Sequence, residues 1–147
     1  MITVSRRCSV APRRVWEVLA DGWSYAGWVV GTQRIRAVEP GWPEVGTKIH
    51  HSAGSWPVLL SDETEVIESD PGRMITLQAK GRPFGEATVN IELTSKGYGT
   101  LIELREDVTS GPSRVVPKPL RQLGIAPRNT ETLLRLSLLA ERHQRPE

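Results

Sequence analysis

The chain has 147 residues, of which 38% are hydrophobic and 24% charged, and a formal net charge of +2. This length suits one domain with a sizeable core, and 19 basic against 17 acidic residues are too evenly matched to argue for nucleic-acid binding. No apolar run approaches the roughly 20 residues of a membrane-spanning helix. The single cysteine, Cys8, permits no internal disulfide, and the first residues lack the apolar core of a secretory leader, so we expect a cytoplasmic protein.

The first thirty residues predict a strand followed by two short helices. Ile2 to Val10 carries β-branched residues and predicts the strand. Pro12 then opens a helix, because a proline in the first turn loses no helical hydrogen bond, and Asp21-Gly22 ends it. A second short helical segment follows from Trp23 to Val30.

The next eighty residues change to a period of two, which is typical of strands with one buried face. The expected strands are Thr32–Glu39, Thr47–Ala53, Val58–Glu68, Arg73–Lys80, Glu86–Thr94 and Leu101–Val108. Short turns join most of them, so the pattern predicts an antiparallel sheet. Its apolar face must be covered, and the helices at the two ends of the chain are the candidates to cover it.

The last part of the chain predicts a long connection and then the longest helix. Residues 111–127 hold four prolines and two glycines, which favours a connection or a lid with at most one helical turn. Asn129 is a suitable N-cap for a helix from Asn129 to His143. Apolar residues occupy most of the circumference of that helix, so we expect it to be enclosed on two or three sides.

Three segments carry a resemblance to a known superfamily. They are APRRVWEVLADGWSYAGWVVG at 11–31, GTKIHHSAGSWPVLLSDETEV at 46–66 and RNTETLLRLSLLAERH at 128–143. The sequence resembles the polyketide cyclase/dehydrase-like branch of the START-like (SRPBCC) superfamily, and within it a recurrent bacterial set. The resemblance implies an α+β helix-grip fold: a seven-stranded curved antiparallel sheet wrapped around a long C-terminal helix, with two short helices after the first strand and a cavity between sheet and helix.

The resemblance says less about activity, because members range from ligand carriers to aromatase/cyclases, and no catalytic residue transfers onto this chain. The sequence has no phosphate-binding loop, nucleophile elbow or metal-spaced cluster. His50 and His51 are neighbours on a strand, so they point to opposite faces and cannot jointly bind one metal ion. We therefore expect neither a cofactor nor a metal.

Strand parity selects two candidate catalytic residues. His51 shares a face with Ile49, and Glu106 shares one with Leu104. If these faces point at the C-terminal helix, both polar groups lie among apolar neighbours, where they could transfer protons or hold the polar end of a ligand. The alternative is that backbone groups or strand neighbours satisfy each of them.

A wider set of residues is expected to line the cavity. Trp23, Trp28 and Phe84 are candidates for an aromatic gate and equally for core residues, while Trp56 lies at a break between strands where loops would rim the cavity. The full expected ligand-binding set is Trp23, Trp28, Ile49, His51, Trp56, Leu77, Phe84, Val89, Leu104, Glu106, Leu133 and Leu136.

Three functions remain open from the sequence. The first is the binding of a small hydrophobic ligand of lipid, polyketide or aromatic type. The second is a metal-free cyclase/aromatase or dehydratase in which His51 or Glu106 moves protons. The third is a protein-interaction module, for which the non-alternating run Val58-Leu59-Leu60 suggests a homodimer contact.

Overall fold

The computed structural model describes residues 2–30, 34–55, 58–81, 85–110 and 118–142. For residues 53–55, 58–61, 81, 110 and 118–124 it describes the backbone alone. Its elements follow one another as expected, with a strand and short helices first, a run of strands next and a long helix last. They are β1 (Ile2–Cys8), α1 (Pro12–Ala20), the 3-10 turn η1 (Gly22–Ser24), α2 (Tyr25–Trp28), β2 (Arg34–Val38), β3 (Lys48–Ser55), β4 (Val58–Asp70), β5 (Met74–Gly81), β6 (Gly85–Lys96), β7 (Gly99–Ser110) and α3 (Lys118–Arg142).

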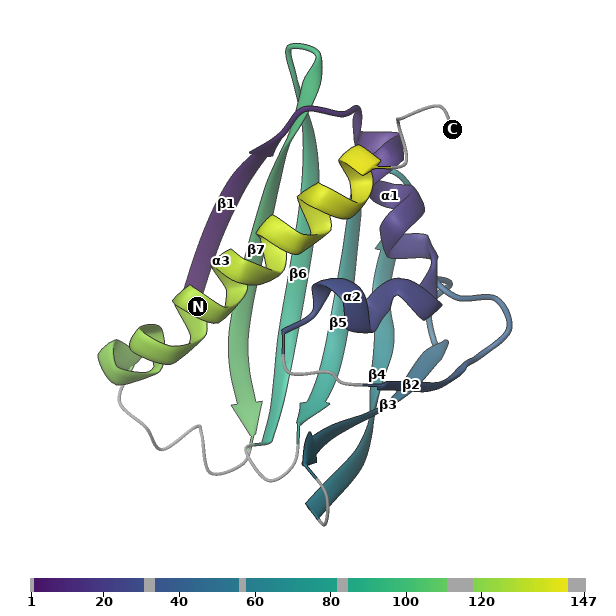
Figure 1. The fold of residues 1–147 in the computed structure, drawn as a ribbon, viewed down its shortest axis with the longest axis vertical. Helices are drawn as coiled ribbons and strands as arrows, with labels where there is room; N and C mark the ends of the chain where they lie inside the picture. The colour runs from purple at the N-terminus through teal and green to yellow at the C-terminus, as the bar shows by residue number, and fades with distance from the viewer. Residues whose placement is uncertain (1, 31–33, 56–57, 82–84, 111–117, 143–147) are drawn as a thin grey trace.

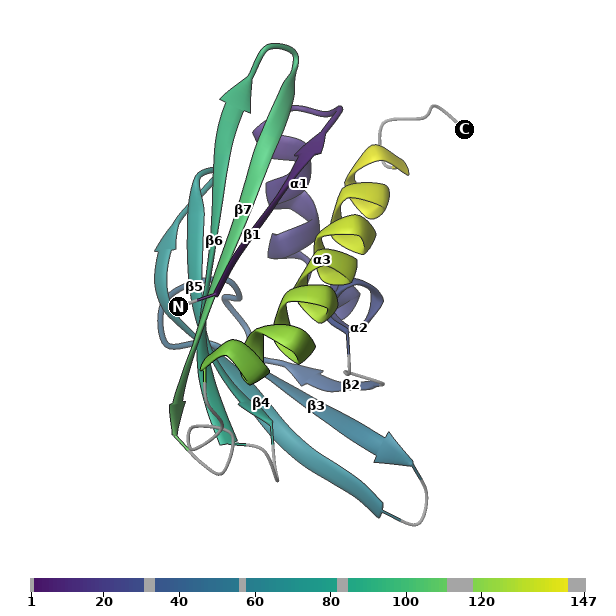
Figure 2. The same ribbon diagram turned by 90° about the vertical axis from the view of Figure 1, so that its left-hand side faces the viewer.

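Within the described residues, seven strands form one antiparallel sheet in the order β1-β7-β6-β5-β4-β3-β2. Strands β2 to β7 are a meander, and β1 pairs with β7 so that Ile2 lies opposite Glu106. The sheet is curved, and all three helices lie on its concave side (Figures 1 and 2). This arrangement confirms the helix-grip fold that the resemblance implied.

The core lies between the concave face and the helices because each strand alternates between the two faces. On β7, Ile102, Leu104 and Glu106 are buried, whereas Glu103 and Arg105, which alternate with them, point to the outer face and remain partly exposed. The helices supply the other half of the core. Its buried helical members are Val15, Val18 and Leu19 of α1, Tyr25 and Trp28 of α2, and Leu133, Leu136 and Ala140 of α3.

The start of the last helix was wrongly predicted. Helix α3 begins at Lys118, so Asn129 lies well inside it and is not its N-cap, and the expected connection is helical from Lys118 onward. The prediction failed because it placed Pro127 in the connection before the helix. A proline inside a helix removes one backbone hydrogen bond and destabilises the helix by about 3 kcal/mol, so a helix boundary is expected there. In the structure Pro127 is accommodated inside α3, and the hydroxyl of Thr130 donates to the carbonyl of Ala126 at 2.8 Å.

Candidate functional site

Three buried polar side chains on the concave side form a continuous chain. The hydroxyl oxygen of Tyr25 lies 3.0 Å from Oγ1 of Thr64, which lies 2.9 Å from Nε2 of His51. The rings of Tyr25 and His51 stack, with centroids 5.7 Å apart and planes inclined by 18°. All three residues are buried. We call them the Tyr25–Thr64–His51 chain.

Local structure explains why these three residues meet. In the register of β3 with β4, Ile49 lies opposite Thr64, and His51 is two residues further along the same face of β3. Tyr25 reaches them from the first position of α2. The turn before it is held by Asp21, whose carboxylate accepts from the backbone N–H of Trp23 at 3.2 Å.

Burial keeps Tyr25 and His51, the two ionisable members of the Tyr25–Thr64–His51 chain, uncharged near neutral pH. Desolvation raises the pKa of Tyr25 to about 12, against a weaker opposing effect of the hydrogen bond with Thr64. Desolvation also lowers the pKa of His51 below its usual 6.5. A neutral phenol, a neutral imidazole and a hydroxyl between them can order their hydrogen bonds in either direction.

An ion pair with a buried carboxylate lies on the same face at β7. Nη2 of Arg128 donates to both oxygens of Glu106, at 2.7 and 2.5 Å, and Nδ2 of Asn129 donates to Oε1 at 3.4 Å. The Glu106 side chain is 7% exposed and that of Arg128 is 42% exposed. The carboxylate is therefore enclosed, and its cationic partner lies at the boundary with solvent.

Between the Tyr25–Thr64–His51 chain and the Glu106–Arg128 ion pair, the concave face is incompletely covered. Thr64 pairs laterally with Ala79, Ala79 with Ala87, and Ala87 with Val108, while Val89 lies opposite Glu106. Ala79, Ala87, Val89 and Val108, which we call the concave patch, are only half-buried. Ile75, Ile91 and Ile102 further along the same face are almost wholly enclosed. The helices thus cover the patch less completely than the rest of the face.

The structure places the two candidate catalytic residues on the concave face, but apart. Strands β4, β5 and β6 separate His51 on β3 from Glu106 on β7. Tyr25 stacks on His51, and the negative charge of Glu106 contributes, after desolvation, to the raised pKa of Tyr25.

The other expected ligand-binding residues fall into four groups. Trp28, Ile49, Leu77, Leu104, Leu133 and Leu136 are buried core residues, and Val89 belongs to the concave patch. Trp23 lies on η1 with 61% of its surface exposed. Trp56, Phe84 and the side chains of Val58-Leu59-Leu60 lie outside what the structure describes, so the gate and the homodimer contact stay predictions.

Four residues of this site were not selected from the sequence: Tyr25, Thr64, Arg128 and Asn129. Thr64 had a usable signal, because it shares a strand face with Val66 in the expected alternation. Tyr25 had none, since its partner is 39 residues away. The sequence pattern predicts Asn129 as the N-cap of a helix and not as a partner of Glu106, and it assigns Arg128 no role.

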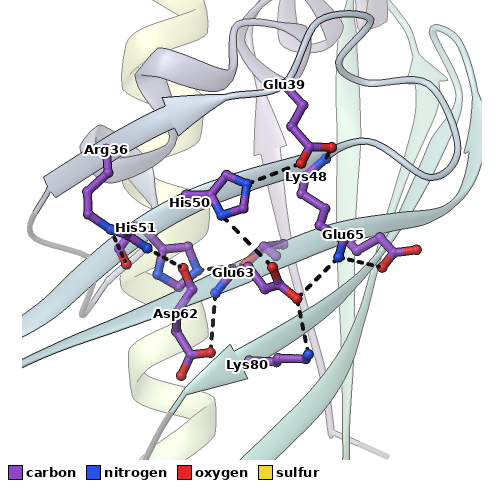
Figure 3. Close-up of polar contacts among 10 residues, drawn as sticks. Arg36, Glu39, Lys48, His50, His51, Asp62, Glu63, Glu65 and Lys80 are labelled. Atoms are coloured by element: carbon purple, nitrogen blue, oxygen red, sulfur yellow. Dashed lines mark hydrogen bonds and ion pairs between the residues drawn. The ribbon is translucent and has the colours of Figure 1, made fainter.

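The opposite face of the sheet carries a partly exposed network of ion pairs (Figure 3). His50 points away from His51, as expected for neighbours on a strand, and its Nε2 lies 3.1 Å from Oε2 of Glu39. Glu63 accepts from Lys80 at 3.1 Å and from Lys48 at 3.3 Å, and chiefly the bond with Lys80 lowers the pKa of Glu63. This network faces solvent and is separate from the concave site.

Two further observations concern metals and membranes. Among the described residues, no three His, Cys, Asp or Glu side chains are grouped so that they could hold a metal ion. Within the same part of the chain, no helix combines the length and the apolarity that crossing a bilayer requires.

Comparison with solved structures gives the same fold. The chain is similar to NE0264 from Nitrosomonas europaea (TM-score 0.74, 15% identity, covering 97% of this chain and 95% of that one). It is also similar to Ara h 8.0201 (TM-score 0.74, 11% identity, covering 96% of this chain and 97% of that one). A third similar structure is the Zhui aromatase/cyclase from Streptomyces sp. R1128 (TM-score 0.70, 14% identity, covering 98% of this chain and 94% of that one). At these identities the likeness concerns the fold alone.

Comparison by sequence identifies the family. No curated protein matches the chain. The family model described as "Polyketide cyclase / dehydrase and lipid transport" matches residues 1–141, nearly the whole sequence. The chain therefore belongs to the polyketide cyclase/dehydrase and lipid transport family.

Proposed function

We propose that this protein binds a small hydrophobic molecule, of lipid, polyketide or aromatic type, between the concave face of the sheet and α3. The observation that carries the proposal is the concave patch: half-buried apolar side chains bordered by Thr64 on one side and Glu106 on the other. Ligand sites in proteins are typically apolar surfaces with a few polar groups placed at their edges. Membership of the family supports the same conclusion.

Burial of the ligand's apolar surface supplies one part of the binding free energy. Burial of apolar surface contributes about 25 cal/mol per Å², so a ligand that buries roughly 200 Å² gains about 5 kcal/mol. The loss of translational and rotational freedom opposes this gain. The polar neighbours therefore matter for affinity and for the orientation of the ligand.

The binding proposal is tested with the neutral apolar dye N-phenyl-1-naphthylamine. Saturable enhancement of its emission by the protein is expected, together with loss of that enhancement in Ala87→Leu, which fills the patch. Ala37→Leu is the matched control, because Ala37 is exposed on β2. Equal binding by both variants, or no saturable enhancement by the parent protein, would reject the proposal. A dye-indifferent protein whose mass rises with concentration in light scattering would favour an interaction module.

A second candidate function is acid–base catalysis of the dehydratase or cyclase type. The Tyr25–Thr64–His51 chain favours it, because a neutral imidazole can accept a proton and a phenol can donate one. In the dehydration of a β-hydroxy ketone, a base takes a proton from the carbon beside the carbonyl and an acid protonates the departing hydroxyl. The products are water and a conjugated enone.

This candidate is tested by following enone absorbance with 4-hydroxy-4-phenylbutan-2-one as substrate. Tyr25→Phe and His51→Gln are each expected to lower the rate of enone formation at least about tenfold. Glu106→Gln tests whether Glu106, the other candidate catalytic residue, takes part. Tyr98→Phe, at a fully exposed position, is the control. No rate above that of buffer would leave ligand binding as the function.

A further inference from the structure

Trp28 carries a buried polar atom with no hydrogen-bond partner in the described part of the chain. The residue is 3% exposed, and its indole Nε1 is one of two side-chain atoms of this kind there. The ring packs edge-on against Tyr25, with centroids 5.2 Å apart and planes inclined by 70°. Trp28, Tyr25 and His51 therefore form a row of three rings, with Tyr25 in the middle.

An indole N–H can only donate a hydrogen bond. Leaving such a donor buried and unpaired has a free-energy cost comparable with that of a lost hydrogen bond. The other indole whose bond is described, that of Trp42, donates to the carbonyl of Leu19 at 3.1 Å. Trp28 thus differs from Trp42 in holding an unused donor, and its ring contacts Tyr25, which reaches the edge of the proposed ligand site through Thr64.

The phenol of Tyr25 can supply a second donor. If Nε2–H of His51 donates to Thr64, then Thr64 donates to the oxygen of Tyr25, and the phenol hydrogen is free to donate to a ligand. The charges that act on the phenol belong to Glu106 and Arg128, which have opposite signs and bind each other. A charged ligand group would lose its hydration there, and no unpaired protein charge of opposite sign would offset that loss.

We propose that the polar end of the ligand is an uncharged hydrogen-bond acceptor, such as a ketone or ester carbonyl, held by the indole N–H of Trp28 with the hydroxyl of Tyr25 beside it. This inference rests on the proposed binding function and specifies the chemistry of its ligand. It predicts selection among molecules of equal size by their polar group.

Three naphthalenes of similar shape test the proposal: 2-acetylnaphthalene, 2-ethylnaphthalene and 2-naphthoate at pH 7.5. The chain has five tryptophans, and disappearance of one indole signal in Trp28→Phe assigns that of Trp28 in ¹H–¹⁵N spectra. The ketone is expected to bind about tenfold more tightly than the hydrocarbon and more tightly than the carboxylate. The ketone alone is expected to move the Trp28 indole proton downfield.

Trp28→Phe is expected to abolish the preference for the ketone over the hydrocarbon, while Trp42→Phe, the matched control, keeps it. Equal affinities for ketone and hydrocarbon, or tighter binding of naphthoate, would overturn this inference and leave the binding function standing. If none of the three compounds binds, both fail. Should Trp28→Phe not fold, the relative affinities of the parent protein for the three compounds decide the question by themselves.

Discussion

One guanidinium nitrogen of Arg128, on α3, lies within hydrogen-bond distance of both carboxylate oxygens of Glu106, on β7, at 2.7 and 2.5 Å. The pair joins the long helix to the sheet beside the concave patch. On the sheet, Glu106 lies between Ile2 and Val89, so its charge has apolar neighbours on both sides. The arginine is what makes an ionised carboxylate tolerable at this position.

Removing Arg128 should therefore cost more than removing the charge of Glu106. Arg128→Met is expected to lower the free energy of unfolding by about 2 kcal/mol, because it leaves a buried charge unpaired. Glu106→Gln is expected to cost about 1 kcal/mol. The double variant should cost less than the two changes added together. Urea unfolding measures all four proteins, and strictly additive losses would show that the two groups do not interact.

Tyr25→Phe should destabilise the protein by about 1 kcal/mol. The change removes the hydroxyl near Thr64 but keeps a ring that can stack on His51. Tyr98→Phe is the matched control, because Tyr98 is fully exposed and should lose nothing measurable. Thermal and urea unfolding compare the two variants, and equal stabilities would show that the buried hydroxyl contributes nothing.

Burial of His51 predicts a loss of stability in mild acid. Its pKa in the folded protein lies below 6.5, the value it takes when exposed. As the pH falls below about 6.5, the unfolded chain binds a proton that the folded chain does not, so unfolding becomes more favourable until the folded pKa is passed. This contribution to stability is complete above that window. It should be present in the parent protein and in His50→Gln, and absent from His51→Gln, in unfolding curves measured between pH 7.5 and 4.5.

The ion-pair network on the outer face should contribute much less to stability than the buried groups of the concave face. Glu63→Gln removes the acceptor of Lys48 and Lys80, but these groups are partly exposed (Figure 3). Exposed ion pairs contribute less than about 1 kcal/mol. We expect a small loss of stability that shrinks further in high salt, and unchanged binding of N-phenyl-1-naphthylamine. Loss of dye binding in this variant would show that the two faces are coupled.

Sequence pattern was sufficient for the elements whose signals are local. Period-two alternation located the strands of the sheet within a few residues, and Pro12 marked the start of α1. The same parity put His51 and Glu106 on the apolar face, where both are buried. The covering of the sheet by the terminal helices followed because a sheet with one apolar face has to be covered by elements of the same chain, whereas the helix-grip architecture was implied by the family resemblance.

The features that failed depend on tertiary context. Pro127 reads locally as a helix boundary, yet α3 passes through it. Asn129 was therefore predicted to cap the helix, although Asn129 and its neighbour Arg128 both bind Glu106 from inside it. Tyr25 could not be singled out, because a short aromatic-rich helix does not reveal which distant hydroxyl its phenol will meet.

We propose that a small apolar molecule binds against the concave patch, and a ¹H–¹⁵N chemical-shift map recorded during titration with N-phenyl-1-naphthylamine tests this site residue by residue. Saturable shifts are expected at Ala79, Ala87, Val89 and Glu106, with Thr88 and Asn90 on the outer face unaffected. Shifts confined to the outer face, or no saturable shifts at any dye concentration, would contradict the proposal.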